Sequence, residues 1–168
     1  LDLGFIEHVE RNLTSLGIRF EKHGNNLWLR LPSGRYICYP GAHMRGRLVP
    51  QFVPLLMAQY GYPLEVAVEK ATLPSLHYYT PKGGALVLEH TYSGKLCENL
   101  TQAIARDVLA EAMLRSPDLP IVLHAHDEIV AEGEHVHALN EALTRGIPWA
   151  PGLPLEAEVK TLERYWKA

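Results

Sequence analysis

The chain has 168 residues, of which 47% are hydrophobic, so it is long enough to form one domain with a buried core. Its formal net charge is −3, which excludes a domain that holds duplex nucleic acid through a general excess of basic residues. No apolar run approaches the length of a membrane span, and Cys38 and Cys97 form no paired motif. Composition therefore indicates a cytoplasmic protein with no membrane partner.

The N-terminal half predicts short elements separated by glycine and proline. Apolar residues at helical spacing predict an amphipathic helix over Leu3 to Leu16. Alternating residues around a Pro-Ser-Gly turn predict a β-hairpin from Asn26 to Pro40. Four prolines divide Gly41 to Leu76, where the pattern favours a helix over Gln51 to Tyr60. We interpret Gly41 to Leu76 as an insertion-like segment.

The second half begins with two strand-like runs, Ser75 to Thr80 and Ala85 to His90, which flank a Gly-Gly turn. The longest helix is predicted over Lys95 to Arg115, with Ser93 as its N-cap. Leucine, isoleucine, valine and alanine recur along this helix at steps of four and predict a wide apolar stripe packed against a sheet. Polar side chains follow its opposite side.

The stretch Leu119 to Glu132 predicts a second β-hairpin, in which two apolar runs flank His126-Asp127-Glu128. Two-residue hairpin turns favour Asn-Gly, Asp-Gly or Gly-X because they need positive φ. The tip here, His126-Asp127, departs from that rule, and a local departure between well-formed strands marks a candidate functional position. The alternative is a solvated acidic turn, because Asp is common in turns.

A helix over His135 to Arg145 and a last strand over Leu155 to Thr161 complete the predicted elements. Their order predicts an α+β fold, with an antiparallel sheet covered on one face by two helices. We expect residues 1–168 to form a single domain.

Three collinear segments carry a resemblance to a known family. His126-Asp127-Glu128 between apolar strands resembles the palm hairpin of family A DNA polymerases, the group that includes bacterial DNA polymerase I and many phage replicases. The segments 91–107 (TYSGKLCENLTQAIARD) and 26–40 (NLWLRLPSGRYICYP) resemble the palm helix and an upstream palm sequence of phage-type members. The resemblance covers most of the chain, least at 41–76. It implies the C-terminal palm portion of a phage or prophage polymerase.

The resemblance implies template-directed nucleotidyl transfer in the complete enzyme, with primer-template DNA and deoxynucleoside triphosphates as partners. In that chemistry two Mg²⁺ ions stabilise the attacking and the leaving oxygens. Asp127 would be the metal ligand, and Glu128 an outer carboxylate, because successive residues of an extended chain point to opposite faces. His126 would position the primer terminus. The remaining implied DNA contacts lie on the long helix: Gln102 in the minor groove, and Lys95, Asn99 and Arg106.

The sequence departs from the family in one important respect. It contains neither the motif A aspartate, which supplies the second metal-bridging carboxylate, nor the nucleotide-binding helix with its lysine. In the family both elements precede the palm helix, so they would fall before Leu1, on an N-terminal polymerase segment. Because the first residue is Leu1 rather than Met, we expect a chain that is processed, cut from a longer product or trimmed, and the sequence does not distinguish these. We expect the isolated chain not to polymerise DNA.

Two alternatives remain open. The chain is alternatively a non-catalytic remnant that keeps the palm fold and binds DNA or a partner protein. A weaker alternative is a zinc site, because His124, His126, His135 and His137 form two H-x-H pairs around the hairpin.

Overall fold

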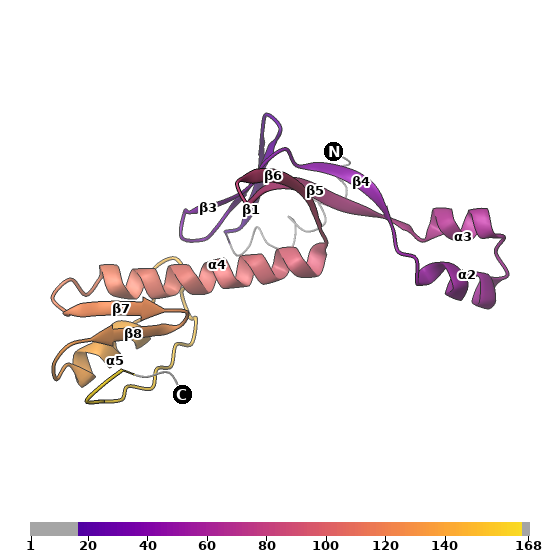
Figure 1. Cartoon of the computed structure of the whole chain (residues 1–168). Coiled ribbons are helices and arrows are strands. Elements are labelled where there is room, and N and C mark those ends of the chain that lie inside the picture. The colour runs from indigo at the N-terminus through magenta and orange to yellow at the C-terminus, as the bar shows by residue number, and fades with distance from the viewer. Residues whose placement is uncertain (1–16, 166–168) are drawn as a thin grey trace. The chain divides into compact units, whose positions relative to one another are not determined.

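The computed structural model describes residues 17–165, in two compact units, Leu1–Glu98 and Asn99–Ala168 (Figure 1). The fold class is α+β, and every strand pair in the described residues is antiparallel. The predicted helix over Leu3 to Leu16 lies outside these residues. In the same range no helix is both long enough and apolar enough to cross a membrane. The prediction of a single palm-like domain stays a prediction.

The first sheet of the N-terminal unit has the strand order β1-β2-β3, with β1 at Arg19–His23, β2 at Asn26–Arg30 and β3 at Tyr36–Tyr39. It confirms the predicted hairpin and adds β1, which was not predicted. Leu27 and Leu29 of β2 are almost fully buried, whereas Arg30 is exposed. This alternation places one face of β2 in the core.

The second sheet has the order β4-β5-β6, with β4 at His43–Leu48, β5 at Thr72–Lys82 and β6 at Ala85–Thr91. It confirms the second predicted hairpin, although β5 is longer than expected and β4 was not predicted. Gly83 and Gly84, both at positive φ, form the turn. The two sheets meet where Tyr39 and Tyr78 pack edge to face, with ring centroids 5.0 Å apart. There Tyr79 N–H also donates to the Pro40 carbonyl at 2.8 Å.

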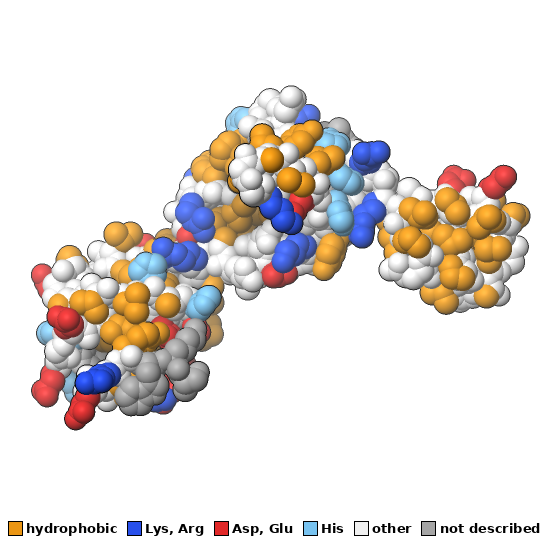
Figure 2. Space-filling view, in the orientation of Figure 1, with side chains coloured by type: hydrophobic (Ala, Val, Ile, Leu, Met, Phe, Trp, Pro, Cys, Tyr) orange, Lys and Arg blue, Asp and Glu red, His pale blue; other side chains and the backbone are white. Residues whose placement is uncertain are grey.

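Two short helices, α2 at Phe52–Tyr60 and α3 at Leu64–Lys70, lie between β4 and β5. Helix α2 is the predicted helix, and α3 was missed. The β4–β5 pairing runs unbroken to Leu48 opposite Thr72, so the helix pair extends from the end of these strands without shifting their register. The helix pair carries exposed apolar side chains (Figure 2): Phe52, Leu55, Met57, Tyr60 and Leu64. The insertion-like interpretation of Gly41 to Leu76 stays a prediction.

Helix α4 runs from Ser93 to Leu114 and crosses the boundary between the units. It starts two residues before the expected position, so Ser93 is the first helical residue rather than a cap that precedes the helix. The expected apolar stripe is buried at Leu96, Leu100 and Ala112. Asp107 is also buried, which the periodicity did not indicate.

The C-terminal unit contains β7 at Ile121–Ala125, β8 at Glu128–Ala131 and α5 at Val136–Thr144. The predicted hairpin and the predicted helix are both confirmed. In place of the single expected sheet, the described residues form three separate sheets. Their strands are joined mainly as local hairpins and do not extend one shared ladder.

The prediction of a last strand over Leu155 to Thr161 is wrong, because this segment forms no strand. The predicted alternation exists, with Leu155, Ala157 and Val159 half-buried and the residues between them exposed. What is absent from the segment is a backbone ladder to a neighbouring strand. The Ala157 carbonyl instead accepts a hydrogen bond from the Asn140 side chain of α5 at 3.3 Å. Alternating apolar residues indicate that one face of a segment is buried. The segment is a strand only if its backbone also pairs with a neighbouring strand.

The β4–β5 register is continuous up to the point where the α2–α3 pair begins. We therefore predict that this helix pair is dispensable for the sheet. Replacing residues 49–71 by Asn-Gly closes β4 and β5 with a favoured two-residue turn. We expect the variant to keep its β-sheet circular dichroism, with a free energy of unfolding within about 1 kcal/mol of the parent, because loop length changes closure entropy slowly.

Leu29→Ala is the comparison variant. Leu29 is 1% exposed, so its truncation should cost about 2–5 kcal/mol in the same denaturant titration. A deletion variant that loses as much stability as Leu29→Ala would show that the helix pair holds the sheet together.

Candidate active site at the tip of the β7–β8 hairpin

The β7–β8 hairpin closes with a two-residue loop. Ala125 pairs with Glu128 and His124 with Ile129, so His126 and Asp127 alone form the connection. A register shift between Ile121 and Leu123 bends the other end of the hairpin. The tip is therefore held by an intact ladder on its own side.

His126 has φ 52° and is the only described residue other than glycine with positive φ. This region is disfavoured for residues with a Cβ, although His, Asn and Asp enter it more often than others. The unusual turn sequence thus adopts the conformation that tight turns require. Strain of this kind, about 1 kcal/mol or more, is characteristic of functional positions.

Two acidic residues follow one another in the sequence at this tip. Asp127 and Glu128 are both exposed, as is His126. The phenol of Tyr165 donates a hydrogen bond to Glu128 Oε2 at 2.9 Å. This bond raises the pKa of Tyr165, so the contact is complete below the ordinary pKa of tyrosine and disappears as pH rises through the raised value. Sequence patterns gave no signal for Tyr165, because the contact joins residues far apart in the chain.

The described residues contain no group of three or more His, Cys, Asp or Glu side chains that could hold a metal ion. The zinc alternative therefore finds no support, since His124, His126, His135 and His137 all lie in the described range and form no such group. A metal ion at the tip would depend on Asp127 and Glu128 with water or substrate oxygens.

Helix α4 places the four predicted DNA-contacting residues along one stripe. Lys95, Asn99, Gln102 and Arg106 follow one another at steps of three or four residues, which share a helix face. Gln102 and Arg106 are exposed and Asn99 is half-buried. Lys95 lies in the other compact unit from these three and donates to both oxygens of Glu98 at 3.0 Å. This pairing with Glu98 raises the pKa of Lys95.

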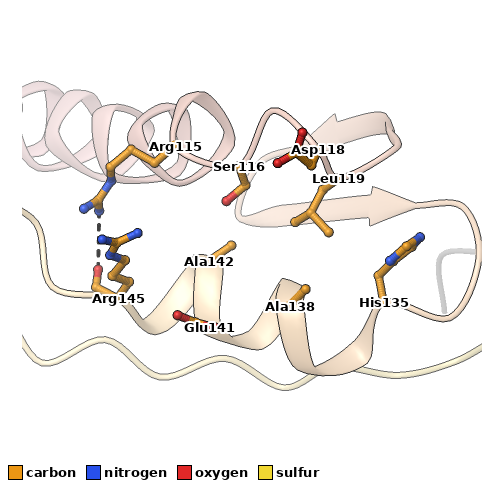
Figure 3. A pocket seen from close by; sticks show the side chains of 9 residues that line it. All are labelled: Arg115, Ser116, Asp118, Leu119, His135, Ala138, Glu141, Ala142 and Arg145. Atoms are coloured by element: carbon orange, nitrogen blue, oxygen red, sulfur yellow. Dashed lines mark hydrogen bonds between the residues drawn. The ribbon is translucent and has the colours of Figure 1, made fainter.

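A pocket of about 410 Å³ lies between α5 and the segment that follows α4 (Figure 3). His135 of the zinc alternative lines it, and none of the predicted Mg²⁺- or DNA-binding residues does. Arg115 closes one side of this pocket. Its guanidinium donates to the Gly146 carbonyl at 3.1 Å and to the Arg145 carbonyl at 3.5 Å, and its Nε lies 3.3 Å from Glu111. That Nε–Glu111 contact lacks hydrogen-bond geometry, and Nε is buried with no hydrogen-bond partner. Arg115 therefore links the end of α4 to the two residues that follow α5.

Comparison with known proteins gives one informative match. The chain is 31% identical over 157 residues to a DNA polymerase of Bacillus phage SP02. The chain is related to a DNA polymerase. The alignment covers 90% of this chain but only 21% of the phage protein, so the chain spans about a fifth of the length of this relative. No protein-family model matches the chain, and no solved structure matches it.

The relationship to a polymerase is shown by an alignment over most of the chain and does not test the role of any single residue. The individual roles assigned to Asp127, Glu128, His126, Gln102, Arg106, Lys95 and Asn99 stay predictions. The structure brings His126, Asp127 and Glu128 together at one hairpin tip and sets the other four on one helix face.

The backbone strain at His126 can be tested by measuring the stability of two variants. His126→Gly should raise the free energy of unfolding by about 1 kcal/mol, because glycine adopts positive φ without strain. His126→Val should lower it by about 1–2 kcal/mol, because a β-branched residue is least tolerated there. Chemical denaturation of the two variants beside the parent chain measures both effects.

Ile129→Val is the matched control, because Ile129 lies in β8 beside the tip, in an ordinary strand conformation. If the glycine variant is less stable than the parent, the histidine side chain contributes more to the hairpin than its backbone strain costs.

Proposed function

We propose that this chain is the C-terminal palm portion of a family A DNA polymerase of phage or prophage type. In the complete enzyme it would take part in template-directed, Mg²⁺-dependent nucleotidyl transfer. The observation that carries this proposal is the position of His126-Asp127 as the whole connection between β7 and β8, in a chain related to a phage DNA polymerase. The isolated chain is inactive under this proposal, because it lacks motif A and the nucleotide-binding helix.

Asp127 is the proposed metal ligand. Its carboxylate is exposed at a point where the backbone is fixed by the pairing of Ala125 with Glu128. The bond from Tyr165 occupies one oxygen of Glu128 and restrains its carboxylate, which suits a supporting role beside Asp127. His126 would then direct its imidazole toward a primer phosphate.

The donor set fits magnesium. Mg²⁺ prefers carboxylate oxygens and is commonly held by one or two carboxylates with water and substrate phosphates, which is what Asp127 and Glu128 offer. When bound, the ion stabilises negative charge on the attacking and leaving oxygens. A second carboxylate strand would come from the N-terminal polymerase segment.

The polar stripe of α4 is the proposed primer-template contact. Gln102 would hydrogen-bond in the minor groove and Arg106 would contact a phosphate. Arg106 is exposed and forms no ion pair with any described residue. Lys95 is held by Glu98, so its contribution to phosphate binding is the smaller of the two.

A non-catalytic role is the second candidate. It differs from the first candidate in needing no metal ion at the hairpin tip. In that case the chain would bind DNA or a partner protein through the same α4 stripe.

The isolated chain should bind a divalent metal ion but should not catalyse nucleotide incorporation. With primer-template, deoxynucleotides and Mg²⁺ we expect no templated incorporation, because half of the two-metal site is absent. Mn²⁺ should still broaden the NMR signals of residues 124–130 at millimolar concentration, and Asp127→Asn should abolish the broadening.

Asp118→Asn is the control, because Asp118 is an exposed carboxylate of the same unit outside the hairpin. Robust incorporation by the 168-residue chain would contradict the predicted inactivity. Equal broadening in parent and Asp127→Asn would remove Asp127 from the proposed metal site.

Primer-template affinity tests the α4 stripe. Arg106→Gln should weaken binding of a recessed primer-template about tenfold at low salt, because it removes a positive charge that would neutralise a phosphate. Fluorescence anisotropy with labelled DNA measures the affinity. Arg30→Gln makes the same charge change at an exposed position of β2 and should change it less than about twofold. Equal weakening in both variants would mean that net charge alone sets the affinity.

A further inference from the structure

Three histidines form a row across the β4–β5–β6 sheet. His43 pairs with His77, and His77 pairs with His90, so the three side chains lie next to one another on one face. The ring centroids of His43 and His77 are 5.7 Å apart, and those of His77 and His90 are 5.9 Å apart. Nothing in the proposed active site uses this row.

The row lies on the solvent face of the sheet. The opposite face carries Leu76 and Thr91, which are 5% and 1% exposed. On the histidine face, His43 and His90 are exposed and His77 is half-buried. A surface of this kind is open to a ligand along three strands.

Backbone hydrogen bonds fix two of the imidazoles. Nδ1 of His43 lies 2.9 Å from the Gly41 carbonyl, and Nδ1 of His77 lies 3.1 Å from the Ser75 carbonyl. A carbonyl oxygen only accepts, so Nδ1 is the protonated nitrogen in both rings. Nε2 is then the remaining polar atom, on the side of each ring away from this bond, where it can meet a ligand.

The same face carries arginines and no acid. Strand periodicity places Arg45 and Arg47 on the face of His43, and no Asp or Glu of β4, β5 or β6 shares it, because Glu89 points to the other side. Neither arginine forms an ion pair within the described residues. Blue and pale-blue side chains gather over this unit in Figure 2.

The distribution of charge along the sequence agrees with a basic surface here. Residues 1–98 contain ten Lys or Arg and eight Asp or Glu, whereas residues 99–168 contain six and eleven. The chain is acidic as a whole, but its basic residues are concentrated in the unit that holds the histidine row.

An aromatic ring completes the surface. Tyr79 is 41% exposed and follows His77 on the same face. Its ring lies against Gly41, where an added Cβ would come within 2.6 Å of it. Glycine at this position, at φ 61°, therefore leaves room for the ring close to the backbone.

We infer that the face formed by His43, His77, His90, Arg45, Arg47 and Tyr79 binds single-stranded nucleic acid. Arginines and imidazoles would contact successive phosphates, and Tyr79 would stack on a base. A flat sheet with exposed rings suits an unpaired strand, whereas duplex grooves are read by a protruding helix or ribbon. The choice of nucleic acid as the polyanion rests on the proposed polymerase function, and the geometry of the face is independent of it.

A metal ion is a poorer fit to this row. The described residues contain no group of three or more His, Cys, Asp or Glu side chains that could hold an ion.

The test is anisotropy of a labelled oligothymidylate of about 12 nucleotides, a length that a small binding surface covers. Arg45→Gln/Arg47→Gln should weaken binding of the 168-residue chain about tenfold at about 50 mM salt. It should also reduce the salt slope by about 1.4, or about 0.7 for each phosphate that is no longer neutralised. Arg19→Gln/Arg30→Gln, an equal charge change at exposed positions of the other sheet, should change affinity less than about twofold.

A second arm tests the histidines. At fixed pH and about 50 mM salt, His43→Gln/His77→Gln/His90→Gln should weaken oligothymidylate binding about threefold, because it removes the three imidazoles that would contact phosphates.

The results of this binding test can be distinguished from those of the tests on the proposed active site. The arginine pairs are compared on oligothymidylate binding alone, without metal or nucleotides, so a failed polymerase assignment does not decide this result. Equal weakening in the two arginine pairs, or no binding by the parent chain, would overturn the inference. Binding that requires added Zn²⁺ and is indifferent to salt would overturn it as well, in favour of a metal site.

Discussion

The tight connection between β7 and β8 is the constraint on which the candidate site depends. With only His126 and Asp127 to reverse the chain, one of them has to adopt a conformation that costs about 1 kcal/mol for any residue with a side chain. The ladder on both sides and the bond from Tyr165 to Glu128 hold the tip in place. Arg115 links the end of α4 to the two residues that follow α5 in the same unit. The paired hairpin thus presents Asp127 and Glu128 to solvent.

The charged residues of this protein are unevenly distributed between its two units. The acidic C-terminal unit carries the carboxylate tip, and the basic residues gather in the N-terminal unit, where one sheet face has two arginines and three histidines without an acid. The net charge of −3 conceals this division. A polyanion would therefore meet local positive surfaces on a chain that is negative as a whole, and it would bind weakly and with strong dependence on salt.

Local sequence predicted the elements whose pattern and turn agree. The hairpin of Asn26 to Pro40, helix α4 and the hairpin tip all combine periodicity with a turn or a long apolar stripe. Strand β4 was missed because its sequence, HMRGRL, contains two arginines and a glycine, and the pairing with β5 makes it a strand. The segment at Leu155 to Thr161 has the alternation but no ladder. Tyr165, Arg115 and the histidine row depend on interactions between distant residues, which periodicity does not report.

The left-handed backbone at His126 also has a genetic consequence. Asparagine and aspartate are the other residues that tolerate this conformation well, and each is reached from a histidine codon by a single-base change. Glycine, which fits best, needs two. Drift at this codon therefore passes first through residues that preserve the turn but remove the imidazole, and aspartate among them would add a negative charge beside Asp127. Variation at this codon among natural copies would thus record whether selection acts on the fold of the hairpin or on the chemistry at its tip.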